Sequence, residues 1–238
     1  MNTTLAAMHH QGLIFSANQG SLQEANHEQC ALLSTGFTQL DQLLGGGWPT
    51  SGVINLQSEP AIGEFTLLQG MFAKAQQEGM VVLINPPAEP CIEWLLAQHV
   101  SLDRVVILRP ENDAHALWAA EQCARSSSCA LVWLWHQGLS FAQARRFNLA
   151  CQQSAALLVL VNYHSQTSAL PVHMSMQLCQ QSQQLKVTLL RQQGRFARGE
   201  ITLDRTQLWP FLLYSQRVQQ GALHTLNAIA EPTHYEVG

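Results

Sequence analysis

The sequence predicts an α/β fold in which helices flank a mostly parallel β-sheet and the C-terminal edge of the sheet is rich in β-strands. Uninterrupted apolar segments, such as residues 155–161, are typical of strands that are covered on both faces. Such segments alternate with helical patterns between residues 52 and 161. After Pro171 the pattern changes to strands joined by polar turns, which predicts the β-rich edge.

The individual elements follow from the same patterns. Phe37, Leu40 and Leu44 share one helical face, so residues 36–44 are predicted to form a helix that Thr35 caps and Gly45–Gly47 ends. Strands are predicted at 52–57, 80–85, 105–108, 130–135 and 156–161, and helices at 63–78, 91–100, 113–126 and 140–154. Further strands are predicted at 174–180 and 185–193, with later turns at Gly194 and Gly199.

These elements divide the chain into three parts. Residues 1–33 are polar and weakly patterned, which predicts an N-terminal arm. Residues 34–206 carry the alternating pattern and are predicted to form the core. Residues 207–238 are predicted to form a C-terminal helix and tail, with the helix at Val218–Ala230.

The composition narrows the functional classes. Only 12% of the 238 residues are charged, so the thinly charged surface predicts a standing protein partner. The net charge of -4 gives no global signal for nucleic-acid binding. The six cysteines lack C-x-x-C pairs and are expected to be reduced thiols. Neither a signal sequence nor a long apolar segment is recognisable, which predicts a cytoplasmic protein without membrane contact.

An altered phosphate-binding loop lies between the strand at 52–57 and the next helix. A working loop reads G-x-x-x-x-G-K-[ST]: its backbone N–H groups and lysine bind phosphates, and its hydroxyl binds Mg²⁺. This chain keeps the second glycine as Gly63. Ser58, Glu64 and Phe65 replace the first glycine, the lysine and the hydroxyl residue. The pattern predicts an inherited loop that has lost its chemistry, with an ordinary strand-to-helix turn as the alternative.

Other signals for catalysis are weak. The strand at 130–135 is followed by His136, so the carboxylate that would hold Mg²⁺ is missing as well. Glu89 occupies the place of a water-activating glutamate, but a surface carboxylate is the preferred interpretation. The ten histidines lack metal-ligand spacing, and no nucleophile motif is recognisable. The sequence therefore predicts no catalytic residue, no cofactor and no metal site.

The tryptophans point to contact with a protein partner. The chain has six tryptophans, and exposed tryptophans often anchor protein interfaces. Trp48 and Trp94 are the better interface candidates, whereas Trp118 and Trp133 are expected in the core.

A basic segment provides a second candidate contact. Arg191, Arg195 and Arg198 cluster in the C-terminal third, where they are suited to phosphates or to an acidic protein surface. The alternative is an ordinary solvated edge hairpin, because edge strands often carry charges that block aggregation.

Two segments together resemble the opening of a known family. The segments Ser34–Asp41 and Leu44–Pro49 resemble the start of the RecA-like core in the bacterial ImuA proteins, SOS-response accessory proteins of mutagenic repair. The resemblance covers residues 12–204 and includes the run Leu-Trp-Ala-Ala-Glu-Gln at 117–122. It implies a RecA-like fold and a non-catalytic protein that supports translesion DNA synthesis through contacts with RecA and the error-prone polymerase. DNA contact through the arginine segment is a weaker expectation.

The segment around Trp94 is similar to the related SulA family of SOS cell-division inhibitors. In that family a tryptophan and a basic residue are implicated in contacting the division protein FtsZ, which implies roles for Trp94 and Arg104. The alternative function is therefore a SulA-like inhibitor that binds FtsZ. The ImuA resemblance is preferred because the typical SulA lacks the Gly-Gly-Gly-Trp-Pro opening. A third and less favoured alternative is an ATP-dependent recombinase-like motor.

Overall fold

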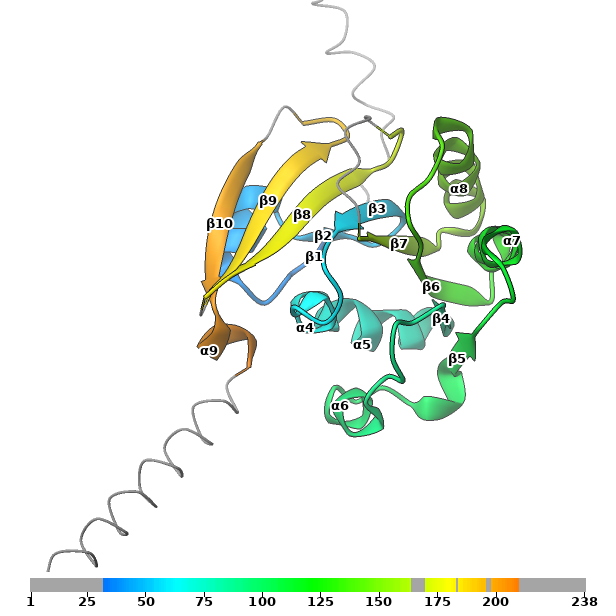
Figure 1. Cartoon of the computed structure of the whole chain (residues 1–238), viewed down its shortest axis with the longest axis horizontal. Coiled ribbons are helices and arrows are strands. Elements are labelled where there is room, and N and C mark those ends of the chain that lie inside the picture. The colour runs from blue at the N-terminus through cyan, green and yellow to red at the C-terminus, as the bar shows by residue number, and fades with distance from the viewer. Residues whose placement is uncertain (1–31, 164–169, 183, 196–197, 210–238) are drawn as a thin grey trace, which may run out of the picture. The chain divides into compact units, whose positions relative to one another are not determined.

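In the part of the chain that the structure describes, eight strands form one β-sheet (Figure 1). The computed structural model describes residues 32–163, 170–182, 184–195 and 198–209. Across the sheet the strand order is β10 (Gly199–Asp204), β9 (Gln184–Gln192), β8 (Met174–Gln181), β3 (Gly52–Gln57), β7 (Leu157–Asn162), β6 (Cys129–Trp135), β4 (Met80–Ile84) and β5 (Val105–Leu108).

The pairing confirms the predicted fold class. From β8 to β5 all neighbouring strands are parallel, and Val53 on β3 pairs with Leu158 on β7 at the centre of the sheet. The last two pairings, β8 with β9 and β9 with β10, are antiparallel and form the C-terminal edge. The turn predicted at Gly199 is wrong, because Gly199 begins β10 and pairs with Leu189.

Helices cover both faces of this sheet (Figure 1). On one face, α4 (Glu64–Leu67), α5 (Gln69–Glu78) and α6 (Ile92–Ala97) contribute to a core that contains Trp133. On the other face, α7 (Asp113–Arg125) and α8 (Phe141–Ser154) bury a second core around Val132. Successive side chains of a strand point to opposite faces, so the neighbours Val132 and Trp133 belong to different cores.

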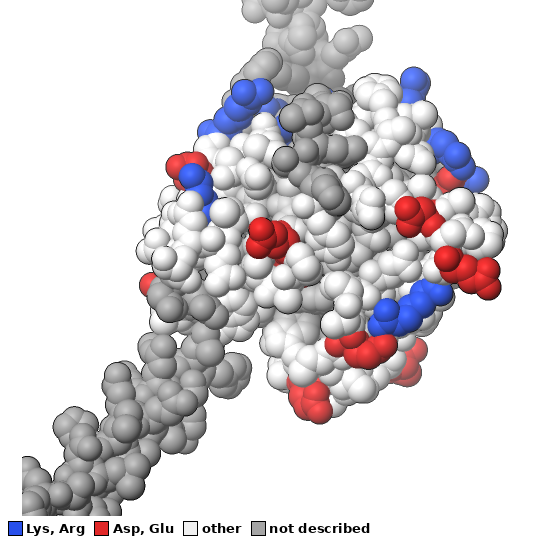
Figure 2. All heavy atoms as spheres, in the orientation of Figure 1, with Lys and Arg blue, Asp and Glu red and all other residues white. Residues whose placement is uncertain are grey.

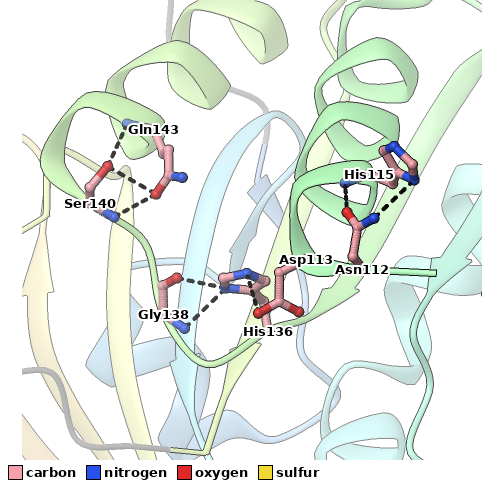
Figure 3. Close-up of polar contacts among 7 residues, drawn as sticks. All are labelled: Asn112, Asp113, His115, His136, Gly138, Ser140 and Gln143. Carbon is pink, nitrogen blue, oxygen red and sulfur yellow. Dashed lines mark hydrogen bonds and ion pairs between the residues drawn. The ribbon is translucent and has the colours of Figure 1, made fainter. Parts of the chain in front are cut away.

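The two helices of the second face begin at well-formed N-caps (Figure 3). Asn112 precedes α7, and its side chain accepts a hydrogen bond of 2.9 Å from the His115 N–H. Ser140 precedes α8 and forms a capping box with Gln143. Both caps satisfy N–H groups that the first helical turn leaves without partners. The predicted starts of these helices therefore agree with the structure to within one residue.

The first described residues differ from the prediction. Helix α3 (Thr38–Leu44) ends at Gly45, whose φ of 75° is left-handed as predicted for a helix-ending glycine. The expected cap at Thr35 is wrong, because Phe37 is the N-cap residue and no side chain caps the helix. Instead, the Thr35 N–H donates to Asp41 at 2.7 Å.

The boundary of the predicted arm also moves. Leu32 and Leu33 form β1 (Leu32–Leu33), which pairs with β2 (Trp48–Pro49), so these two residues belong with the folded part. The rest of the predicted arm lies outside the described residues. At the other end, α9 (Arg205–Leu208) closes the described chain, and the helix predicted at Val218–Ala230 lies outside it.

The helix predicted at 63–78 is two helices. Leu68 interrupts it, so α4 is a short turn after the altered loop and α5 follows as a separate helix. Among the described residues, no helix has the length and apolar character needed to cross a membrane.

Candidate functional site

The altered phosphate loop links β3 to α4. Its first residue, Ser58, is buried, and the Ser58 N–H donates to the Asn162 carbonyl of β7 at 3.0 Å. Ala61 and Gly63 both adopt positive φ, at 61° and 123°. Backbones that turn in this way point N–H groups into a small concave site for an anion. The loop therefore retains the backbone shape of an anion site.

The carboxylate of Glu64, a residue of the loop itself, occupies that site. The Glu64 side chain turns back over the loop, and its Oε1 accepts a hydrogen bond of 2.9 Å from the Ala61 N–H. Its Oε2 accepts a second bond of 3.1 Å from the Gly63 N–H. Glu64 is only 2% exposed, so its carboxylate occupies the loop as a buried group. The residue that replaces the lysine thus takes the N–H donors that a phosphate would need.

Aromatic rings fill the neighbouring space. Phe65, which replaces the hydroxyl residue, stacks on Trp133 with ring centroids 4.8 Å apart. The ring centroids of Phe72 and Trp135 lie 5.3 and 5.5 Å from that of Phe65. Trp94 meets the Phe65 ring edge-on, with the centroids 5.6 Å apart. These separations are typical of favourable aromatic pairs. The side of the loop that would carry Mg²⁺ is therefore an apolar cluster.

These residues do not fit a magnesium nucleotide. The loop amides are engaged by Glu64, Phe65 offers no hydroxyl, and β6 ends in Trp135. Glu89 is a surface carboxylate, as preferred from the sequence, and it pairs with Arg109 at 2.6 Å. Among the described residues, no group of three His, Cys, Asp or Glu side chains is placed to hold a metal ion.

The pKa of Tyr163 is affected by the negative charge of Glu64 in the loop. Burial raises the pKa of Tyr163 to about 12, and the charge of Glu64 adds to the increase. Its hydroxyl is buried without a hydrogen-bond partner among the described residues. A neutral phenol beside a buried carboxylate is consistent with these two effects.

We expect Glu64→Gln to lower the pKa of Tyr163, because the substitution removes the nearby negative charge but leaves the burial unchanged. An absorbance titration of tyrosinate formation measures this pKa, and Tyr163→Phe assigns the signal among the chain's three tyrosines. An identical Tyr163 pKa in the wild-type protein and the Glu64→Gln variant would contradict the position of Glu64.

A cavity of ≈ 260 Å³ opens beside the loop. The loop, the segment between β4 and α6, α6 itself and Trp209 form its walls. Phe65, Trp94 and Leu95 form an apolar wall of the cavity. Its acidic lining residues are Glu64 and Glu89, and Glu89 is paired with Arg109. The cavity can therefore hold an apolar side chain of a partner, rather than a polyphosphate.

Trp209 is a wall residue that the sequence did not single out. A Cβ atom at Gly63 would lie 2.9 Å from Cη2 of Trp209. The retained glycine thus permits both the positive φ of the loop and the close approach of this ring. The tryptophan lies far along the sequence in a short segment after β10, so no local pattern connects it to the loop.

We expect Gly63→Ala to lower the free energy of unfolding by about 2 kcal/mol, because it combines backbone strain with a steric clash. Chemical denaturation measures the change. Gly194→Ala is the matched control, since Gly194 also has positive φ but a Cβ there would meet nothing within 4 Å. Equal losses for the two variants would show that the contact with Trp209 is unimportant.

The two tryptophans predicted to contact a partner, Trp48 and Trp94, differ in burial. Trp94 is half-buried on α6, where it lines the cavity and contacts Phe65. Trp48 is 0% exposed, so the prediction that it contacts a partner is wrong. Strand β2 holds Trp48 in the first core, which the sequence pattern around Gly45–Gly47 did not reveal. The opposite error occurs at Trp118, which was expected in the core but is 63% exposed.

Arg104 lies close to the element that carries Trp94. It ends the short 3₁₀ helix η3 (Leu102–Arg104), which contacts α6. Its Nη1 donates to the Gln76 carbonyl at 2.7 Å, while the residue remains exposed. Ile92 and Leu96 on α6 are 54% and 53% exposed, so this corner also presents apolar surface.

The predicted arginine segment lies elsewhere on the sheet. Arg191 is at the end of β9 and donates to the Leu170 carbonyl at 2.7 Å, and the Arg195 guanidinium lies over Gly45. Arg198 precedes β10, and all three residues are exposed. Figure 2 shows cationic side chains gathered over this end of the β9–β10 edge, at the upper left of the view. The structure therefore does not bring them to the loop cavity.

Comparisons with known proteins agree with the RecA-like resemblance. The chain is 26% identical to the protein RecA of Picosynechococcus sp. over 113 residues, which is 47% of this chain and 32% of that protein. It is 28% identical to RecA of Synechocystis sp. and 29% identical to RecA of Prochlorococcus marinus over the same length. The chain spans about a third of the length of these curated relatives. No family model matches it.

Among solved structures, the chain is similar to the crystal structure of SulA from Pseudomonas aeruginosa. The identity is 21%, the TM-score is 0.39, and the match covers 46% of this chain and 96% of that one. The comparisons thus support a RecA-like chain.

Proposed function

We propose that this chain is a non-catalytic RecA-like accessory protein of the SOS DNA-damage response, which acts by binding other proteins. The observation that carries this proposal is the Glu64 carboxylate, which accepts the N–H groups of Ala61 and Gly63 in the phosphate loop. The stack of Phe65 on Trp133 supports it further, because an apolar cluster occupies the magnesium side.

The likeness to RecA over 113 residues supports a place in the same cellular response. The resemblance of Ser34–Asp41 and Leu44–Pro49 to the ImuA opening suggests the more specific role, which is support of translesion DNA synthesis. In this role the chain would contact RecA and the error-prone polymerase. The cavity beside Trp94 is the preferred contact surface, because it is apolar and bordered by exposed residues of α6.

Isothermal titration calorimetry with Mg²⁺-ATP tests the non-catalytic part. We expect no saturable heat from this chain under conditions in which RecA, as the positive control, binds. Saturable binding would overturn the proposal, since a bound nucleotide would require Glu64 and Phe65 to leave their observed positions.

Deletion of the gene tests the cellular role. We expect damage-induced mutagenesis to fall, to be restored by the wild-type chain, and to remain low with Trp94→Ala. Ile107→Ala is the matched control, because it truncates an exposed apolar residue on β5, away from the cavity lining. Normal mutagenesis in the deletion strain would contradict the translesion role.

The arrangement of α6 and η3 favours one alternative function. It places Trp94 and Arg104, the two residues implied in FtsZ contact, on elements that touch. Overexpression distinguishes this SulA-like inhibitor from the preferred role. Filamentation that Trp94→Ala and Arg104→Glu both abolish would support the inhibitor, and normal division would oppose it.

A further inference from the structure

A groove separates α7 and α8 on the face of the sheet opposite the altered loop, at the right of Figure 1. It has a volume of ≈ 310 Å³. Leu117 and Trp118 line it from α7, while Gln143, Arg146 and Phe147 line it from α8. These residues recur at intervals of about one helical turn, so the groove runs between the N-terminal parts of the two helices.

The two helices expose unusually large apolar side chains. Trp118 is 63% exposed, Phe141 is 61% exposed and Leu149 is 50% exposed. Of these three residues Trp118 lines the groove, whereas Phe141 and Leu149 lie elsewhere on α8. Tryptophan in particular contributes strongly to protein interfaces, because it buries a large surface with little loss of side-chain freedom.

A buried carboxylate holds two cations at the groove. Glu121 is buried, and its Oε1 accepts a hydrogen bond of 2.9 Å from Nη2 of Arg125. Its Oε2 accepts from Nη2 of Arg146. The arginine side chains are 52% and 63% exposed, so a partner can reach both of them. Glu121 thus orients two guanidinium groups before any partner arrives.

The face therefore carries a positive charge on a chain whose net charge is -4. Together α7 and α8 carry Arg125, Arg145 and Arg146 against Asp113 and Glu121, which leaves a surplus of one positive charge. Figure 2 shows cationic side chains over α8 at the right of the view. Asp113 lies at the first turn of α7, 3.9 Å from His136 (Figure 3), whereas Arg125 lies in the last turn of the same helix.

We propose that the α7–α8 groove binds an acidic segment of a partner protein. An apolar side chain of that segment lies against Trp118, and its carboxylates pair with the guanidinium groups of Arg125 and Arg146, which Glu121 orients. Arginine forms two parallel hydrogen bonds with a carboxylate, which gives such a contact both strength and direction. This site goes beyond the proposed function and is separate from the loop cavity, so either can fail without the other.

The observed chemistry favours a protein segment over a nucleic acid. Binding to a nucleic-acid backbone depends on many phosphate contacts, whereas this face offers a small surplus of positive charge. The exposed Trp118 in the groove instead matches the apolar centre of a protein interface.

Fluorescence anisotropy with a labelled amphipathic peptide of glutamate and leucine tests the proposal. We expect saturable binding to the full chain, and about tenfold weaker binding for Trp118→Ala and for Arg146→Gln. The same peptide with lysine in place of glutamate should not bind. Ile107→Ala and Lys74→Gln are the matched controls for lost apolar surface and lost charge, and each should change the Kd less than about twofold.

Three results would overturn the proposal. The first is peptide binding that Trp118→Ala and Arg146→Gln leave unchanged. The second is tighter binding of a single-stranded oligonucleotide that both variants abolish, which would assign the face to nucleic acid. The third result uses the wild-type chain, so it does not depend on the folding of a variant. It is a photo-crosslinking peptide that labels residues outside α7 and α8.

Discussion

Phe65→Ala is expected to lower the free energy of unfolding by about 3 kcal/mol, near the lower end for a truncated aromatic core residue. The Phe65 ring contacts Phe72, Trp94, Trp133 and Trp135, so its loss leaves a space that several rigid rings border. Because these rings cannot easily close the gap, the cost includes a cavity in addition to lost apolar burial. Denaturation followed by tryptophan fluorescence measures both the stability and the changed environment of the cluster.

Phe141→Ala provides the matched control for this experiment. It removes the same atoms from a side chain that is 61% exposed, so we expect a change within about 0.5 kcal/mol. Similar losses for the two variants would mean that Phe65 does not form the centre of an aromatic cluster. Phe65 would then not form a fixed wall of the cavity beside the loop, which is the proposed contact surface.

Glu64→Ala is expected to destabilise the chain by about 2 kcal/mol. The substitution leaves the N–H groups of Ala61 and Gly63 without their observed acceptor, and an unpaired buried donor costs about 1–3 kcal/mol. Water that enters the space offsets part of this cost. Thermal unfolding and chemical denaturation measure the loss.

Inorganic phosphate should partly restore the stability of Glu64→Ala. The freed N–H groups attract an anion, so phosphate should raise the Tm of this variant more than that of the wild-type protein. Glu59→Ala is the control, because Glu59 lies in the same loop but is exposed. If phosphate affects all three proteins equally, the Glu64 carboxylate is not acting as an internal substitute for a bound anion.

The sheet was predictable because its strands are encoded locally. Residues 52–57 and 105–108 have the predicted bounds, since apolar runs end sharply at turn-forming or polar residues. Strand β10 was missed because residues 199–204 alternate between burial and exposure at a sheet edge, where the pattern is weak. The break at Leu68 was also missed, because an apolar helical pattern continues through it.

The tryptophans show where prediction from sequence ends. Trp48 and Trp118 have the same side chain, yet Trp48 is fully buried and Trp118 is 63% exposed. Their burial depends on which elements pack over them. For Trp48 this includes the β1–β2 pair, and for Trp118 it is the open side of the α7–α8 groove.

The mostly parallel fold and the replacement of the loop's lysine and hydroxyl residue by Glu64 and Phe65 can be read from the sequence. What these two replacements do depends on the packing of the folded chain. It turns Glu64 onto the loop amides, stacks Phe65 on Trp133, and brings Trp209 against Gly63. The reason is physical, because strand and helix patterns depend on near neighbours, whereas a binding site depends on distances between residues far apart in the chain.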